Sequence, residues 1–244
     1  DYPTIQAGID AAKDGDIVVV YPNTYYENII LNKTITLTSL ALFDTTTNTM
    51  KDSLDEWYGW VGVNWQVIDS LIVNTIIDGS LGNKSTVTIA PDSIVTIYFC
   101  IEPQILGFTI QGGSGTEMDR YSKTHEGETI TEKQHLGGGI LSFKSNPKIH
   151  YNIIQNNGLT GDIETGAAIY AASSGEDCDF SSRRSKLNET CDNDSYDLRY
   201  NFFENNESRQ GKHLANRLFD GEFDLSGGVF DWWNCQNPEY QTPI

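Results

Sequence analysis

The chain has 244 residues, of which 38% are hydrophobic, and this is enough to form one sizeable core. Its 16 Lys and Arg against 34 Asp and Glu give a formal net charge of -18, which argues against a nucleic-acid partner, because phosphate neutralisation needs clustered positive charge. No apolar run is long enough to span a bilayer, and the start of the chain lacks the pattern of an export signal. We therefore expect one acidic domain over residues 1–244, with no membrane span.

The start of the chain predicts a helix followed by a buried strand. Thr4 can cap a short helix that runs through Ala12 and stops at Asp14-Gly15. The continuous β-branched run at residues 17–21 then ends at a Pro-Asn pair. Such a run is typical of a strand that is buried on both faces.

Two short sequence motifs, which we call phrases, recur along the rest of the chain. The first is an apolar strand followed by a polar residue and then Gly, Ser or Asn, and it stands at residues 75–80, 107–113, 151–157 and 200–206. The second begins with small residues and continues into a strand, and it stands at residues 138–143, 166–171 and 227–231. Short strands that recur with tight polar turns predict a parallel solenoid. An antiparallel sandwich is the alternative, but Asn-Gly and Asp-Gly here close repeats of one kind rather than link mirrored strands.

Four segments near the N-terminus resemble the capping helix and first coil of right-handed parallel β-helix proteins of the pectin-lyase-like superfamily. They are YPTIQAGIDAA at 2–12, DGDIVVVYP at 14–22, TYYENI at 24–29 and ITLTS at 35–39. The later phrases are similar to the repeats of that superfamily. The resemblance implies an all-β, right-handed parallel β-helix (solenoid) with an N-terminal capping helix and first coil in residues 1–31 and with long loop insertions. It also implies an extracellular or cell-surface location.

The resemblance does not fix a reaction, because the superfamily includes lyases, hydrolases, esterases, phage tailspikes and adhesins. Residues 24–27 are similar to the first signature of pectin methylesterases, but the Asp-bearing motif G-x-x-D-F is missing. The polygalacturonase motifs N-T-D, Asp-Asp and G-H-G are missing as well. A polysaccharide lyase of another type remains, or no enzyme at all. Such a lyase needs a base together with a cation, such as Ca²⁺, that offsets the uronate charge.

Two predicted insertions exceed the length of the bare repeat, at residues 114–135 and 173–197. The first gathers basic and titratable groups, and its candidates for a catalytic base are Arg120, Lys123, His125, Lys133 and His135. The alternative for this segment is a solvated loop with scattered charges.

The second insertion is rich in carboxylates at alternate positions, as in oxygen-rich cation loops. Its candidate Ca²⁺ ligands are Asp177, Asp179, Asp192, Asp194 and Asp197. The alternative is a soluble loop closed by a disulfide between Cys178 and Cys191, and four unpaired cysteines are equally allowed.

Aromatic residues crowd a further stretch at residues 44–66, and the candidates for carbohydrate binding are Trp57, Tyr58, Trp60 and Trp65. They can equally cover an open end of the solenoid core. The sequence thus predicts a secreted or surface protein that recognises a polysaccharide, with a lyase activity on an acidic glycan as its catalytic form. Because the chain is itself acidic, an acidic glycan requires a bridging cation. The alternative is a non-catalytic, adhesin-like or structural surface module that binds a protein partner.

Overall fold

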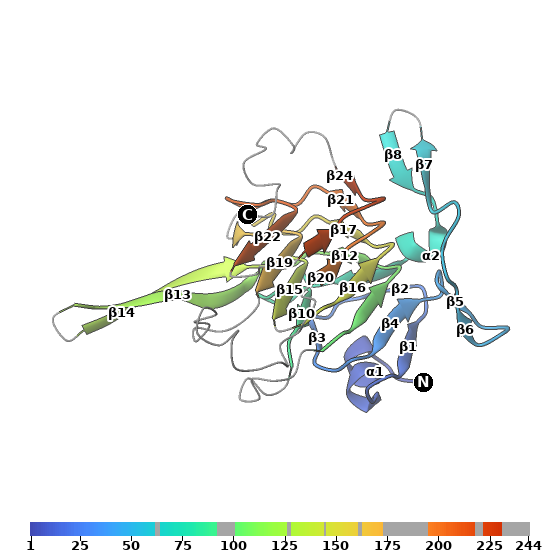
Figure 1. Ribbon diagram of the computed structural model, residues 1–244, viewed down its shortest axis with the longest axis horizontal. Coiled ribbons are helices and arrows are strands. Elements are labelled where there is room, and N and C mark those ends of the chain that lie inside the picture. The colour runs from blue at the N-terminus through green and yellow to red at the C-terminus, as the bar shows by residue number, and fades with distance from the viewer. Residues whose placement is uncertain are drawn as a thin grey trace.

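The computed structural model of the protein is a three-sided parallel β-solenoid (Figure 1). It describes residues 1–61, 64–91, 101–125, 128–143, 145–160, 163–172, 195–217 and 222–230. The chain passes through three sheets in turn, and every strand pair within these sheets is parallel. The prediction of a parallel β-solenoid is therefore confirmed.

Each of the three sheets receives one short strand from each coil. Sheet 1 consists of β1 (Ile17–Val20), β4 (Thr36–Ser39), β11 (Gln104–Leu106), β16 (Lys148–His150), β20 (Ser195–Asp197) and β23 (Glu222–Asp224). Sheet 2 consists of β2 (Asn23–Tyr25), β9 (Thr75–Asp78), β12 (Thr109–Gln111), β17 (Ile153–Gln155), β21 (Phe202–Glu204) and β24 (Val229–Phe230). Sheet 3 consists of β3 (Ile29–Leu31), β10 (Val87–Ile89), β15 (Ile140–Phe143), β19 (Ile169–Ala172) and β22 (Leu214–Arg217).

The register stacks like residues in the core. In sheet 2, one fully buried column consists of Ile77, Ile110, Ile154 and Phe203. These positions follow one another because side chains alternate between the two faces of a strand, so the middle residue of each strand points inward. The copies of the first recurring phrase form the strands of this sheet. Aligning these copies in the sequence gives the same residue pairs as the register of the strands.

Residues in the left-handed conformation turn the corner between sheets 1 and 2. The positions two residues before β12, β17, β21 and β24 all have positive φ, and they are Gly107, Tyr151, Tyr200 and Gly227. This corner also corrects the prediction for residues 227–231, which were grouped with the second phrase. Strand β24 pairs with β21 in sheet 2, because Gly227 is a corner residue of the same kind as Gly107.

Directly after this corner, buried asparagines connect successive coils, or rungs, of the solenoid. The Asn152 side chain donates from Nδ2 to the carbonyls of Ile105 and His150, both at 2.9 Å, and its Oδ1 accepts from the Phe108 N–H at 2.9 Å. Asn201 repeats the arrangement one rung later, and its Oδ1 accepts from the Asn152 N–H at 3.0 Å. Both side chains are fully buried, so the ladder satisfies main-chain groups that the corner removes from the sheets.

A short helix, α1 (Ile5–Ala11), covers part of the N-terminal end of the core, with Thr4 as its N-cap as predicted. Its first N–H groups are bound by the Glu27 carboxylate, which accepts from Ile5 N at 2.9 Å and from Gln6 N at 3.0 Å. At its other end, Lys33 Nζ donates to three carbonyls of residues 9–12, at 2.8–3.0 Å. Opposite charges at the two ends complement the helix dipole.

We expect Glu27→Gln to lower the free energy of unfolding by about 1 kcal/mol, because it removes the charge from both hydrogen bonds at the helix N-terminus. Chemical denaturation of the two proteins measures the difference. Glu207→Gln is the matched control, since Glu207 is exposed and far from α1 in the sequence. An equal change in both variants would contradict a capping role for Glu27.

Residues 114–135 and the aromatic stretch form strands outside the solenoid, whereas residues 173–194 of the second insertion lie outside the described residues. Residues 114–135 were expected to be a loop; they instead form a long antiparallel hairpin of β13 (Thr116–His125) and β14 (Glu128–Leu136), which projects from the body (Figure 1). Its Thr, Ile and Tyr residues favour strands. β18 (Ile163–Thr165) pairs with its base. The aromatic stretch forms the hairpins β5 (Phe43–Asp44) with β6 (Thr49–Met50) and β7 (Tyr58–Val61) with β8 (Asn64–Val67), followed by α2 (Ser70–Val73).

Candidate functional site

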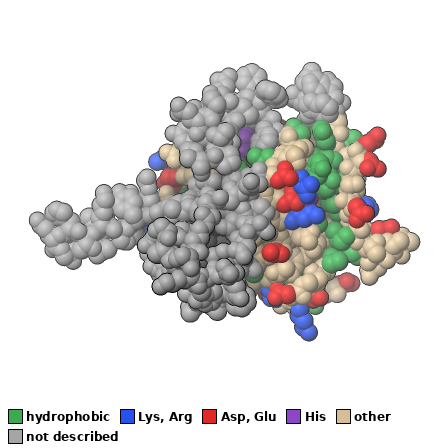
Figure 2. Space-filling view, in the orientation of Figure 1, with side chains coloured by type: hydrophobic (Ala, Val, Ile, Leu, Met, Phe, Trp, Pro, Cys, Tyr) green, Lys and Arg blue, Asp and Glu red, His purple; other side chains and the backbone are tan. Residues whose placement is uncertain are grey.

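A cluster of charged side chains lies on the outer face of sheet 1, and we call it the charged patch. Its members are Lys148, His150, Asp197, Arg199 and Asp224. Lys148 and His150 share the outer face of β16 because Ile149 between them is buried in the core. Acidic and basic side chains lie side by side over this part of the molecule in Figure 2.

Arg199 forms the centre of the patch. Its Nε donates to Asp197 Oδ1 at 2.7 Å and its Nη2 donates to Asp197 Oδ2 at 2.8 Å, so the guanidinium holds the carboxylate with two hydrogen bonds. The same Nε lies 3.4 Å from Asp224 Oδ2 on the next rung. One guanidinium therefore links two successive coils.

His150 lies behind this pair. Its Nε2 is 2.5 Å from Asp197 Oδ1, although the contact is not aligned as a hydrogen bond, and the His150 side chain is only 5% exposed. Burial lowers the pKa of His150, and this effect outweighs the opposing influence of Asp197, so the ring is neutral at pH 7. A buried ring that faces its own carboxylate is poorly placed to take a proton from a ligand.

The pKa of Asp197 is lowered as well, which for a carboxyl group favours the charged form. Burial alone would raise it, but the hydrogen bonds from Arg199 and the contact with His150 outweigh burial and lower the pKa of Asp197 to about 2. The hydrogen bond to Asp197 raises the pKa of Arg199. Asp197 and Arg199 therefore stay charged over the physiological range, and such perturbed groups cluster at functional sites.

An aromatic column stands beside the patch at the corner of sheets 1 and 2. The rings of Tyr151 and Tyr200 stack in parallel, with centroids 5.0 Å apart and an angle of 9°. Trp57 contacts Tyr151 edge-on at 5.6 Å, and the His150 ring meets both tyrosines edge-on. Gly227 closes the column, because a Cβ there would lie 2.3 Å from the Tyr200 ring.

Both tyrosines adopt the left-handed conformation, with φ of 57° and 60°, which costs a bulky residue about 1–2 kcal/mol. Glycine occupies the same corner position at Gly107 and Gly227 at no such cost. The tyrosine rings make contacts that glycine cannot make: both meet the His150 ring, and Tyr151 contacts Trp57 of the aromatic insertion.

The predicted carbohydrate-binding aromatics occupy different environments. Trp57 is 3% exposed and packs against Tyr58, at 4.8 Å between ring centroids, and against Tyr151. A sugar ring cannot stack on Trp57 without displacing these contacts. Trp60 and Trp65 are register partners in the hairpin of β7 and β8, and only their backbone is described.

The predicted bases on the hairpin of β13 and β14 do not all lie on one face of the hairpin. The pairing places positions 133 and 135 on one face of the ribbon and positions 123 and 125 on the other, with a register shift at Arg120. Lys133 forms an exposed ion pair with Glu117. His135 is half-buried near the base of the hairpin. For Arg120, Lys123 and His125 the structure describes the backbone alone.

The predicted cation ligands fall almost entirely outside the described residues. Asp177, Asp179, Asp192 and Asp194 lie there, as do Cys178 and Cys191. Asp197 is described, and its carboxylate is engaged by Arg199. Within the described ranges, no group of three or more His, Cys, Asp or Glu side chains is arranged to hold a metal ion.

Comparisons with protein-family models, with curated proteins and with solved structures find no match for this chain. Among the described residues, no helix has the length and apolar character needed to cross a membrane.

Sequence reasoning singled out Asp197 but missed its partners, although a signal for them was present. The two phrases that begin at Tyr151 and Tyr200 align in the sequence, and the residues directly before them are His150 and Arg199. In a parallel solenoid, aligned positions stack on neighbouring rungs. The alignment therefore places His150 and Arg199 close together.

Proposed function

We propose that the protein is an extracellular or cell-surface β-helix of the pectin-lyase-like superfamily that recognises a polysaccharide, and that the charged patch is its binding surface. One observation carries the proposal: Arg199 and Asp197 form a two-bond pair on the outer face of sheet 1, with buried His150 behind it. The two side chains are partly buried, at 37% and 30% exposure, so the pair presents a fixed donor and a fixed acceptor at the surface. This presentation is the support for binding at the charged patch.

The chemistry of the patch suits sugar hydroxyl groups. Each hydroxyl donates one hydrogen bond and accepts others, and the patch offers both kinds of partner side by side. Arg199 has N–H groups beyond the two that bind Asp197, and Asp224, half exposed, supplies acceptor oxygens. Lys148 adds a further donor. Because Arg199 is already oriented, little side-chain entropy is lost on binding.

The charged patch extends along the solenoid axis, and this arrangement suits a polymer. Its residues come from β16, β20, the turn after β20, and β23, on successive rungs of sheet 1. Neighbouring parallel strands lie about 4.8 Å apart, so a new polar side chain follows at that interval along the solenoid axis, in the order Lys148, Asp197 and Asp224. A chain of similar sugar units laid along this axis meets a new set of partners at each rung.

The predicted lyase activity and the Ca²⁺ requirement are parts of this proposal that depend on the substrate. A net charge of -18 repels a polyuronate, so an acidic glycan needs a bridging cation. A neutral glycan needs none. Chelation of Ca²⁺ therefore separates the two substrate classes.

Affinity gels that contain neutral glycans or polyuronates test the proposal, with Ca²⁺ and with a chelator. We expect retention on at least one glycan, and Arg199→Gln and Lys148→Gln should each weaken it by about tenfold, or about 1.4 kcal/mol. Arg209→Gln is the matched control for charge, because Arg209 is exposed and outside the patch. Absorbance of unsaturated products in the same samples reports lyase activity.

Retention that is equal in Arg199→Gln and Arg209→Gln would place glycan binding elsewhere on the protein. Absence of retention on every glycan would contradict recognition altogether and favour the adhesin-like alternative. Thermal unfolding of each variant shows whether it is folded, which matters because Arg199→Gln leaves Asp197 without its main partner.

A further inference from the structure

The first strand of sheet 1 has an open edge. β1 pairs with β4 on one side, and no described strand lies on its other side. No side chain among the described residues forms a hydrogen bond to the main chain of Ile17–Val20. Its outer N–H and C=O groups therefore form a template for another strand.

The edge of sheet 3 at the same end of the solenoid is closed. Gln6 of α1 lies against β3, where its Oε1 accepts from Ile30 N at 2.7 Å and its Nε2 donates to Ile30 O at 3.3 Å. One side-chain amide thus takes the place of a neighbouring strand. Within the described part of the chain, a specific side chain closes this edge, whereas the edge of β1 has no such cover.

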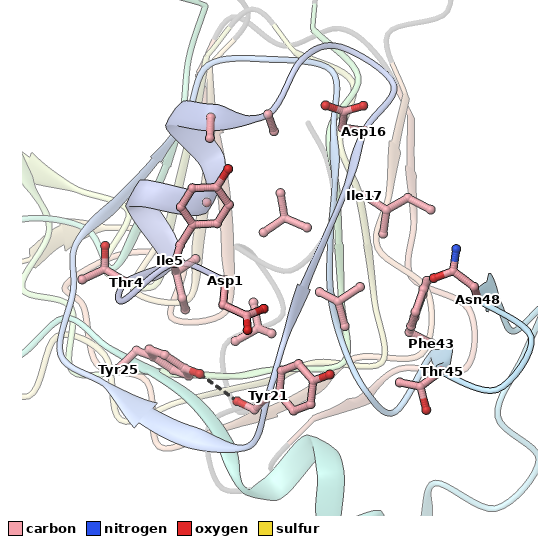
Figure 3. Close-up of a pocket in the computed structure, with 17 residues that line it drawn as sticks. Asp1, Thr4, Ile5, Asp16, Ile17, Tyr21, Tyr25, Phe43, Thr45 and Asn48 are labelled. Carbon is pink, nitrogen blue, oxygen red and sulfur yellow. Dashed lines mark hydrogen bonds between the residues drawn. The ribbon is translucent and has the colours of Figure 1, made fainter.

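A cavity of about 940 Å³ lies along the open edge (Figure 3). Its walls are α1, β1, the end of β2 and the hairpin of β5 and β6. Several large apolar side chains around it are exposed to solvent, namely Tyr2 at 61%, Ile17 at 44% and Tyr21 at 60%. Exposed apolar side chains that line one groove are typical of an interaction site.

We infer that this groove binds an extended strand of a partner polypeptide, which pairs with the open edge of β1 and continues sheet 1. The main-chain groups of β1 select a peptide rather than a small molecule. Val18 and Val20 pack toward the core and Ile17 lies on the other face, so the bound strand is apolar on both of its faces.

Charge further defines the partner. Asp16 lines the groove, and the whole chain carries a net charge of -18. A second copy of this chain brings the same negative charge to an acidic rim, which opposes self-association. A partner strand with basic residues at its ends is favoured instead. This inference is independent of glycan binding at the charged patch.

A synthetic peptide with an apolar Val and Ile centre and lysines at both ends tests the inference, with fluorescence anisotropy as the readout. We expect saturable binding and slower hydrogen exchange of the amides in Ile17–Val20. N-methylation of alternate peptide amides should weaken binding by about tenfold or more, because it removes the donors that strand pairing requires.

Ile17→Asn should weaken binding of the peptide by a similar factor, and Leu81→Asn is the matched control, because Leu81 is 79% exposed and does not line the groove. Equal affinity for the peptide and its N-methylated form would overturn strand pairing. Self-association of the free protein in sedimentation velocity, abolished by Ile17→Asn, would overturn the choice of a basic partner in favour of a second copy.

Discussion

Replacing Asn152 by Leu is expected to lower the free energy of unfolding by about 3–6 kcal/mol, because buried main-chain groups lose their partners. The substitution removes the acceptor of the Phe108 N–H and the donor to the carbonyls of Ile105 and His150. No water can take their place without opening the corner, since Asn152 is fully buried. A domain has about 5–15 kcal/mol of stability in total, so the loss is a large part of it.

Chemical denaturation followed by circular dichroism measures this effect. Asn83→Leu is the control, because Asn83 is exposed and the same change of side chain leaves no buried group unpaired. We expect the control to stay within about 0.5 kcal/mol of the parent protein. A loss below about 1 kcal/mol for Asn152→Leu would show that the corner rearranges to satisfy its own main chain.

Gly113→Ala is expected to destabilise the protein by more than about 3 kcal/mol, because two rungs meet too closely at this position. A Cβ on Gly113 would lie 1.8 Å from the Gly138 carbonyl oxygen and 2.7 Å from Thr86 Oγ1. The first of these contacts is with main chain, which cannot move aside as a flexible side chain does. The rungs would have to separate at this corner.

Gly15→Ala separates steric from conformational effects. Gly15 has a φ of 87°, but nothing lies within 4 Å of a Cβ placed there. Its substitution should therefore cost only the strain of the left-handed conformation, about 1–2 kcal/mol. Thermal unfolding of both variants gives the comparison. A larger loss for Gly15→Ala than for Gly113→Ala would contradict the steric explanation.

The repeating part of the fold was predictable from the sequence because its signals are local. Most strands carry their own apolar centre, and Gly or Asn follows β12, β17 and β21 at the corner with positive φ, at Gly112, Asn156 and Asn205. The alignment of residues 151–157 with residues 200–206 is the register of β17 with β21. The helix cap at Thr4 was equally local. By contrast, residues 227–231 were misassigned, because a pair of glycines precedes strands in both sheets.

The site was predictable only in part, because its members come from different coils. Asp197 was predicted as a cation ligand, whereas the structure pairs it with Arg199. The alignment of residues 151–157 with residues 200–206 places Arg199 beside His150, but the alignment does not show whether the carboxylate of Asp197 binds a cation or the guanidinium. The burial of Trp57 depends on where the insertion packs, and tertiary packing decides this. The positions of Lys123 and His125 depend on a single register shift in the hairpin.

The asparagine ladder also bears on how the length of such a protein can change during evolution. Asn152 bonds to the rung before it in the same way as Asn201 bonds to the rung of Asn152. In the coil of Asn152, the side-chain oxygen accepts a hydrogen bond from the N–H of Phe108 on one neighbouring coil, and the N–H of Asn152 donates one to Asn201 on the other. Duplication or loss of one whole coil would leave every such bond matched, whereas a change of a few residues would break them. Gain and loss of complete coils is therefore the least disruptive route to a longer or shorter solenoid.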